Sequence, residues 1–514
     1  MTGNRQTVLI LDFGSQYTQL IARRVREQHV FSQIVPHSIS MEDVNRMGPA
    51  AIILSGGPSS VHSDRAPQFD DRILDLNLPI LGICYGLQLL MAHFGGEVHS
   101  DGDGEYGSAR ISHDSSSLLL KGISHRTNVW MSHGDKVDEV PEGWIISARS
   151  TNGVVAAVEH QEKPLWGTQF HPEVVHTSEG EKILSNFLFS LAQCKRDWTP
   201  ASFIEATEQG IREIVGRKRV LCGVSGGVDS SVVAKLLYRA IGEQLRAVFI
   251  DHGLLRRDEG KSVRDTLQSS LGVPIEYHDH SEKFLGKLKG IIDPEQKRSV
   301  IGEQFIRSFE EIARSDGSGD YLAQGTLYPD VIESGGMSGT ADVIKSHHNV
   351  GGLPRHMTFK LIEPLRELFK DEVREVGHKL GIPTSILGRH PFPGPGLAVR
   401  IIGEVTPERV GILQETDDIL IRALTDRGVY DDIWQAFCVL IPVRTVGVMG
   451  DQRTYGNLIA IRAVTSVDGM TADWYRMNHD LLGEISNQIV NRVPAVNRVV
   501  YDVSSKPPST IEWE

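Results

Sequence analysis

The chain has 514 residues, enough for about three domains at roughly 150 residues each, so a single small module is excluded. Asp and Glu outnumber Lys and Arg by 66 to 53, and the formal net charge of −13 excludes bulk attraction to nucleic-acid phosphates. Four cysteines without CxxC spacing argue against a disulfide framework or a thiolate zinc cluster, and they favour a reducing cytoplasm.

Short apolar runs, each followed by turn residues and a helical pattern, recur along the chain. They lie at 8–11, 51–54, 79–83, 220–224 and 247–250. This alternation predicts α/β layers with parallel strands. The first run is too short for a signal peptide, and no stretch of about 20 apolar residues is present that would span a membrane.

Changes in composition divide the chain at two places. A polar segment at 195–200 follows a helical pattern at 179–192 and is expected to be a linker. Further on, an expected amphipathic helix at 365–380 precedes the Pro- and Gly-rich segment 388–396. The last region combines a helical pattern at 407–426 with β-like runs at 436–443, 458–464 and 498–503, which predicts a small α+β domain. We therefore expect domains at 1–197, 198–389 and 390–514, with a mobile lid at 334–354.

Cys84 lies where an apolar strand gives way to a helical pattern, with Gly82 and Gly86 two residues away on each side. Glycines relieve the strain of such a turn, and a helix N-terminus stabilises a thiolate. A nucleophilic thiol needs a base and an orienting carboxylate, which His171 and Glu173 supply on one side of an extended segment. A buried structural thiol and a turn histidine are the alternatives for each residue alone, but the two motifs together favour catalysis.

On these motifs, residues 7–195 resemble the class I glutamine amidotransferases, α/β domains in which a Cys-His-Glu triad releases ammonia from glutamine. The resemblance implies that Cys84 is the nucleophile forming a γ-glutamyl thioester, His171 the general base and acid, and Glu173 its orienting partner. It also implies an oxyanion hole made by the amides of Gly57 and Tyr85. Gln88 and the turn at 131–135 are expected to contact the substrate glutamine.

A second glycine-rich turn follows the apolar run 220–224. Its small residues allow main-chain amides to approach an anion, and the helix that follows, expected at 232–237, adds a favourable dipole. It lacks the GxxxxGK[ST] pattern of a Walker loop, and Asp229 needs a bridging cation such as Mg²⁺ to approach phosphate. For a bare Ser-Gly-Gly, a capped tight turn is the alternative.

The complete SGGVDS sequence resembles the pyrophosphate loop of ATP pyrophosphatases, which adenylate a carbonyl oxygen. The resemblance implies a Rossmann-like domain with a parallel sheet, with Asp229 as the metal ligand. The ATP-binding residues are then expected to be Ser225, Gly226, Gly227, Val228, Asp229, Ser230 and Ser231.

Four later segments, 323–334, 344–354, 390–397 and 506–514, extend the resemblance over nearly the whole chain, to the glutamine-hydrolysing GMP synthases. This resemblance implies a cytoplasmic ligase of guanine nucleotide biosynthesis. ATP, with Mg²⁺, adenylates the 2-oxygen of XMP, and ammonia displaces AMP to give GMP, with pyrophosphate and glutamate as by-products. A homodimer formed through the C-terminal domain is also implied, at an apolar sheet such as 439–443 or 499–503.

The same resemblance assigns two further groups of residues. The adenylation site and lid are expected to include Asp330, Glu333, Lys345, Lys370 and Asp371. The XMP contacts are expected to be Arg307, Gln435, Arg498, Lys506, Ile511 and Glu512. From residue type alone, solvated surface cations, or pairing of Lys370 along its own helix, are the alternatives.

Three other functions fit part of the pattern. A glutamine-dependent NAD synthetase shares the ATP loop, but its amidotransferase half resembles nitrilases, which the Cys-His-Glu set disfavours. A tRNA-thiolating RNA-binding module would need a basic face and more cysteines. A silent regulatory binder would not need two complete reactive sites. If the chain acts as the GMP synthases do, ammonia must pass from Cys84 to the adenylated intermediate as the free base. We therefore expect a channel or a closing motion to deliver it.

Overall fold

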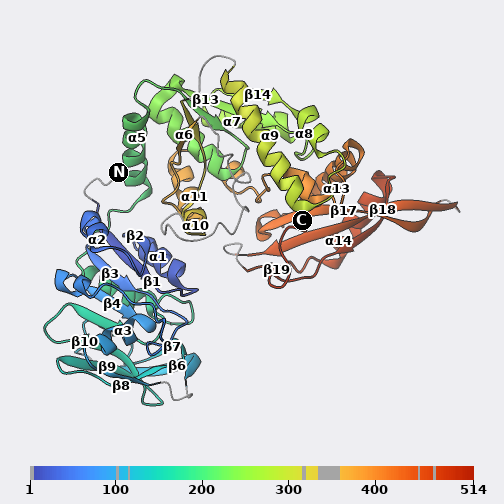
Figure 1. Ribbon diagram of the computed structural model, residues 1–514. Coiled ribbons are helices and arrows are strands. Elements are labelled where there is room, and N and C mark those ends of the chain that lie inside the picture. Colours follow the sequence, from blue (N-terminus) through green and yellow to red (C-terminus); the bar gives the residue numbers. More distant parts are fainter. Residues whose placement is uncertain are drawn as a thin grey trace. The chain divides into compact units, whose positions relative to one another are not determined.

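The computed structural model describes residues 5–99, 104–113, 116–314, 320–333, 359–449, 452–466 and 471–514. The chain forms two compact units (Figure 1). The first comprises residues up to Phe203 together with 331–333, and the second comprises the other described residues from Ile204 onward. Within the described ranges, the longest and most apolar helices still fall short of what a membrane crossing requires.

A nine-stranded sheet forms the centre of the first unit, in the order β2-β1-β3-β4-β11-β10-β9-β6-β7. Its parallel strands are β1 (Thr7–Asp12), β2 (Phe31–Pro36), β3 (Ala51–Leu54), β4 (Ile80–Ile83) and β11 (Leu165–Thr168). Its antiparallel strands are β10 (Val155–His160), β9 (Trp144–Ser150), β6 (Glu105–His113) and β7 (Arg126–His133). The expected parallel layers are confirmed for the first half of this sheet only. Two short strands, β5 (Glu97–His99) and β8 (Lys136–Glu139), pair separately.

Short helices connect the strands of the first unit. They are α1 (Thr18–Glu27), α2 (Met41–Met47), α3 (Tyr85–His93) and α4 (Gly180–Ser185), and α4 runs on into a π-helical turn at Asn186–Leu191. The expected polar linker after this turn is wrong, because the segment packs on the first unit. The Trp198 amide donates to the carbonyl oxygen of His29 at 2.9 Å, and the buried Trp198 ring lies 4.8 Å from that of Phe31, tilted by 53°. Helix α5 (Pro200–Val215) follows directly.

The turn from β4 into α3 leaves no room for side chains on its two glycines. A Cβ on Gly82 would lie 2.7 Å from the carbonyl oxygen of Gly86, and a Cβ on Gly86 would collide with the main chain of Leu54. Cys84, between them, has a φ of 53°, a left-handed conformation that costs energy in a residue with a side chain. The packing of the turn therefore holds the nucleophile candidate in a strained position.

We expect Gly86→Ala to destabilise the first unit by about 1–3 kcal/mol, because the new methyl group meets backbone that belongs to the sheet and cannot withdraw. Thermal unfolding followed by circular dichroism measures the effect. Gly286→Ala is the matched control, since a Cβ there meets nothing within 4 Å. An unchanged unfolding midpoint for Gly86→Ala would contradict the packing argument.

The second unit contains two sheets. The first is five-stranded and parallel throughout, in the order β14-β13-β12-β15-β16, which confirms the expected Rossmann-like sheet. Its strands are β12 (Val220–Gly223), β13 (Leu245–Asp251), β14 (Ile275–Asp279), β15 (Tyr321–Ala323) and β16 (Lys360–Ile362). The helices of this part are α6 (Val228–Ile241), α7 (Glu259–Leu271), α8 (Ser281–Leu288), α9 (Pro294–Arg314), α10 (Tyr328–Glu333), α11 (Lys370–Lys379) and α12 (Thr384–Leu387).

The helix expected at 365–380 begins only at Lys370. Leu365 and Leu368 are buried in the turn before it, so their apolar spacing reflects packing of that turn and not a helical face. The Phe369 amide donates to the Glu372 carboxylate at 2.8 Å, which satisfies a main-chain donor at the true helix start.

The second sheet of this unit has four strands, β17 (Gln435–Met449), β18 (Gln452–Thr465), β19 (Asp473–Trp474) and β20 (Val496–Tyr501), with helices α13 (Pro407–Asp426) and α14 (His479–Arg492). In Figure 1, β17 and β18 form a long hairpin that extends beyond α14. One apolar core runs from Leu221 and Val248 of the parallel sheet to Leu440 and Ile459 of this one. The two sheets are therefore packed as one body.

Candidate active site

Cys84, His171 and Glu173 come together beside the elbow. Nδ1 of His171 lies 2.7 Å from Oε1 of Glu173, and both side chains are buried. Burial opposes a charge on the His171 ring, but the Glu173 carboxylate and a hydrogen bond to Cys84 outweigh it and raise the pKa of His171 to about 10. A protonated ring next to sulfur stabilises negative charge on the nucleophile. The arrangement is that of a thiol activated by an oriented imidazole.

Neighbouring backbone groups hold the triad rigidly. The Cys84 amide donates to Thr168 at the end of β11 at 2.7 Å, which fixes the elbow to the strand leading to His171. The His171 amide donates to the Trp130 carbonyl oxygen at 3.0 Å, and the Tyr17 ring lies edge-on at 5.0 Å. The imidazole is therefore held in one orientation beside the sulfur.

The proposed oxyanion loop and glutamine-binding turn lie around the same sulfur. A Cβ on Gly57 would lie 3.3 Å from the ring of Tyr85, so the two residues are close neighbours. Tyr85 is the first residue of α3, and its amide therefore has no acceptor within the helix. Nε2 of Gln88 donates to the Asp135 carbonyl oxygen at 2.9 Å, which ties α3 to the residues that follow β7. The turn expected at 131–135 is confined to its last residues, because 131–133 belong to that strand.

Gln169 is a neighbour of the nucleophile that sequence reasoning missed. Its side chain is fully buried, and its Nε2 lies 3.6 Å from Sγ of Cys84. The sequence feature that could have identified Gln169 is its position in the Thr168–His171 segment, two residues before the proposed base His171. An amide donor at that distance orients the sulfur and shares its developing charge.

The glycine-rich loop after β12 folds back on itself. Gly226 has a φ of 80°, and the hydroxyl of Ser231 donates to the Gly227 carbonyl oxygen at 2.8 Å. Oγ of Ser225 lies 3.1 Å from Oγ of Ser230. Helix α6 begins at Val228, four residues before the expected start at 232, so the loop's last residues form its first turn. A helix N-terminus at this place attracts anions.

Lys370 and Asp229 form an ion pair at this loop. Nζ of Lys370 lies 2.6 Å from each carboxylate oxygen of Asp229, and both side chains are half-buried. Pairing of Lys370 along its own helix is therefore wrong, since its partner lies 141 residues away in sequence. In the ranges described above, no cluster of three or more His, Cys, Asp and Glu side chains could hold a metal ion.

The other adenylation candidates differ in placement. Asp330 accepts a hydrogen bond from the Leu327 amide at 2.9 Å and so caps α10, while Asp371 lies in the first turn of α11. Lys345, the side chain of Glu333 and the expected lid at 334–354 lie outside the described residues.

Two of the expected XMP contacts meet directly. Nε2 of Gln435 donates to Oε1 of Glu512 at 2.8 Å. Arg400, which sequence reasoning missed, is fully buried and holds both oxygens of Glu512, at 2.8 and 3.0 Å. An arginine at the end of the short 3₁₀ helix Gly396–Arg400 carries no local signal of such a role, so only the fold identifies it.

The remaining XMP candidates are more scattered. The side chain of Ile511 packs in an apolar cluster with Phe437 and Val439. Arg498 is exposed on β20, Arg307 pairs with Glu303 on α9, and the main chain of Lys506 bonds to Ala472.

Three family models match the chain. They are glutamine amidotransferase class-I at residues 9–191, NAD synthase at 203–283, and GMP synthase C terminal domain at 422–513. Fold and site thus define a class I glutamine amidotransferase joined to an ATP-pyrophosphatase-type α/β domain.

Full-length relatives identify the family. The chain is 53% identical over 514 residues to a GMP synthase [glutamine-hydrolyzing] from Brachyspira hyodysenteriae. It is 54% identical over 515 residues to one from Symbiobacterium thermophilum, and each match covers 100% of both chains. A solved structure of a putative GMP synthase subunit from Thermoplasma acidophilum is 31% identical, with a TM-score of 0.34, over 37% of this chain and 96% of that one. The chain belongs to the glutamine-hydrolysing GMP synthases.

Membership in this family settles the class of reaction. The chain is a ligase that makes GMP, takes nitrogen from glutamine and consumes ATP. The NAD synthase model reaches only residues 203–283, the part around the ATP loop, so that alternative is wrong for the whole chain.

Proposed function

We propose that Cys84 attacks the side-chain amide of glutamine while His171 moves the proton. An S–C bond forms, and the C–N bond breaks as His171 returns the proton to the leaving ammonia. Water then hydrolyses the thioester to glutamate. The amides of Gly57 and Tyr85 donate to the oxyanion. The 2.7 Å contact between His171 and Glu173 beside the strained cysteine is the observation that carries this proposal.

At the second site, the 2-oxygen of XMP attacks the α-phosphorus of ATP, and pyrophosphate leaves into the Ser225–Ser231 loop. Ammonia then displaces AMP to give GMP. Lys370 faces the loop from α11 and offers a cation for phosphate oxygens. Gln435, Arg498, Lys506, Ile511 and Glu512, with Arg307, are proposed to contact XMP.

Mg²⁺ is proposed to bind at Asp229. The half-buried Asp229 carboxylate lies in the first turn of α6, at the end of the loop, with Lys370 beside it. Mg²⁺ sites that include substrate phosphates need only one or two carboxylates, so the residues fit. When bound, the ion would neutralise phosphate charge during pyrophosphate departure.

The test is incubation of the full chain with XMP, ATP, Mg²⁺ and glutamine. GMP, AMP, pyrophosphate and glutamate are expected in equal yield, because one ammonia displaces one AMP. Chromatography of the nucleotides checks the stoichiometry. Formation of ADP, or consumption of ATP without AMP, would contradict adenylation.

We further propose domains at 1–197, 198–389 and 390–514 and action in the cytoplasm, on small-molecule substrates, with no nucleic-acid or membrane partner. All four cysteines lie in the described part of the chain and are free thiols, which supports a reducing compartment.

A homodimer through the C-terminal hairpin is part of the proposal. Val443, Val446, Val448 and Tyr455 are exposed along β17 and β18, whereas Val439 is fully buried, so the outer part of the hairpin is the better surface. Val448→Asp is expected to shift the chain toward monomer in sedimentation equilibrium. Tyr106→Asp, equally exposed at 72% in the first unit, is the control. A dimer unaffected by Val448→Asp would rule out this surface.

A further inference from the structure

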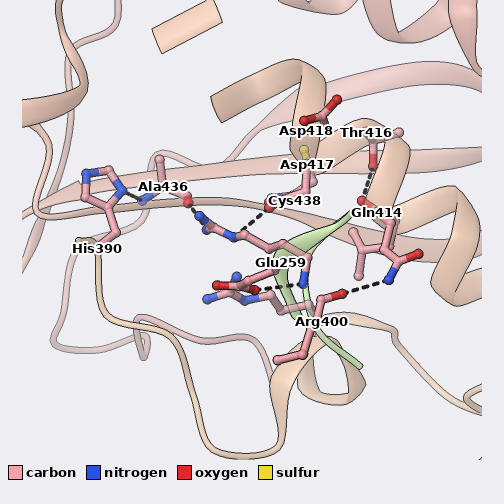
Figure 2. Close-up of polar contacts among 12 residues, drawn as sticks. Glu259, His390, Arg400, Gln414, Thr416, Asp417, Asp418, Ala436 and Cys438 are labelled. Carbon is pink, nitrogen blue, oxygen red and sulfur yellow. Dashed lines mark hydrogen bonds and ion pairs between the residues drawn. The ribbon is translucent and has the colours of Figure 1, made fainter. Parts of the chain in front are cut away.

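Arg256 lies between the two sheets of the second unit. It precedes α7, and its Nε lies 2.9 Å from Oδ2 of Asp417 on α13. Its Nη2 donates to the carbonyl oxygen of Ala436 on β17 at 3.1 Å. Figure 2 shows Asp417, Ala436 and Cys438 grouped around these contacts. Asp417 is fully buried, and this arginine is the cation beside it.

On one side, Arg256 is connected to the ATP loop. Its amide donates to one carboxylate oxygen of Glu259 at 2.9 Å, and the other oxygen accepts from Nη2 of Arg389 at 2.8 Å. Nη1 of Arg389 in turn donates to the Gly226 carbonyl oxygen at 3.1 Å. A chain of charge-assisted hydrogen bonds thus runs from Arg256 to the loop proposed to hold pyrophosphate.

On the other side, Arg256 is connected to the proposed XMP contacts. Oδ1 of Asp417, the oxygen not paired with Arg256, accepts from the Cys438 amide at 3.0 Å, so Asp417 and Arg256 together hold β17 at Ala436 and Cys438. Gln435, the preceding residue of β17, donates to Glu512. The strand end that carries Gln435 is therefore fixed from two directions.

A second route leads to Glu512 through an aromatic ring. The guanidinium of Arg256 lies 5.5 Å from the ring centroid of Phe392, and that of Arg400 lies 5.1 Å from the same ring. Arg400 donates a hydrogen bond to each carboxylate oxygen of Glu512. Cation–π contacts at these distances are attractive, so the two arginines share one aromatic support.

We propose that Arg256 is a positioning residue for XMP, which fixes the Gln435 end of β17 relative to the Gly226 loop. The inference rests on the proposed function, in which Gln435 and Glu512 contact XMP. In-line attack on ATP requires the two substrates to be placed closely, and small displacements of one binding element lower both affinity and rate. A buried ion pair adds little net stability compared with an apolar pair of similar size. The Arg256–Asp417 pair is therefore better explained by the positions in which it holds its neighbours than by a contribution to stability.

The experiment uses the full chain with ammonium chloride as nitrogen source and compares Arg256→Lys and Asp417→Asn with the wild type. Lysine keeps the charge but cannot reach Asp417 and Ala436 with the same fork of donors. Asparagine keeps an acceptor for the Cys438 amide but removes the charge. We expect the KM for XMP to rise about tenfold in both, with the KM for ATP within about twofold.

Asp418→Asn is the matched control. It is the next residue of α13 and pairs with the exposed Arg422 at 2.9 Å, and Figure 2 shows Asp418 beside Asp417. Its kinetic constants are expected to match those of the wild type. Glutaminase activity, measured as glutamate release, should be unchanged in all three variants, because the triad lies in the other unit.

An unchanged KM for XMP in Arg256→Lys and Asp417→Asn would overturn the positioning role. Equal increases for XMP and ATP, together with a lowered unfolding midpoint, would do the same, because they would show general loosening of the fold. Gln435→Ala distinguishes failure of the positioning role of Arg256 from failure of the proposed XMP contact of Gln435. If it raises the KM for XMP and Arg256→Lys does not, only the positioning role fails; if it leaves that KM unchanged, the XMP contact itself is wrong.

Discussion

Replacement of Cys84 by alanine is expected to abolish GMP synthesis from glutamine while synthesis from ammonium salt continues. Without the sulfur no thioester forms, and loss of a nucleophile lowers a hydrolytic rate by roughly 10⁴-fold or more. The amination site itself is untouched, since it lies in the second unit and needs only ammonia. Glutamate release and GMP formation, each with glutamine or ammonium chloride, measure the two halves separately.

Cys194→Ala provides the matched control for this experiment. Cys194 is buried in the same unit, and burial together with nearby Asp197 raises the pKa of its thiol to about 11, so it remains an unreactive thiol at neutral pH. Both activities should persist in this variant. If Cys84→Ala also lost synthesis from ammonium, the two sites would not be separable.

The parallel strands were predictable because strands buried on both faces are continuous apolar runs. Residues 8–11, 51–54 and 247–250 all lie in such strands. Most of the antiparallel half of the first sheet gives no such run, and only β10 resembles the parallel strands in this respect. In β6, for example, buried and exposed residues alternate, and the adjacent strand β9 pairs with β10 through shifts in register. A pattern broken by shifts cannot be distinguished from a loop by periodicity alone.

The candidate site was predictable to the extent that its chemistry is local in sequence. Cys84 lies between two glycines, and His171 and Glu173 are two residues apart, so a short motif contains the geometry. The pairing of Lys370 with Asp229 depends on how α6 and α11 pack, which no local pattern reports. Ile511 shows a different limit of sequence-based prediction. An apolar residue in a C-terminal motif could contact a ligand or pack in the core, and the sequence does not distinguish the two.

Replacement of Lys370 by methionine is expected to lower the rate of GMP synthesis from ammonium by roughly 10²–10³-fold, the usual cost of removing one preorganised charge from a transition state. Methionine preserves most of the side-chain length, so the apolar stem still packs against α11's neighbours. Glutamate release should be unchanged. The rate of AMP formation at saturating XMP and ATP is the measurement, because it isolates the adenylating site from glutamine hydrolysis.

A partly exposed Lys–Asp pair contributes only about 0–1 kcal/mol to stability, so the unfolding midpoint of Lys370→Met should remain close to that of the wild type. Lys283→Met is the control, because Lys283 forms a similar ion pair elsewhere in the unit. Its Nζ lies 2.6 and 2.9 Å from the two carboxylate oxygens of Glu311. A large loss of rate with little loss of stability in Lys370→Met alone would mean that the cation acts on phosphate. A full rate with a lowered midpoint would instead make Lys370 a purely structural partner of Asp229.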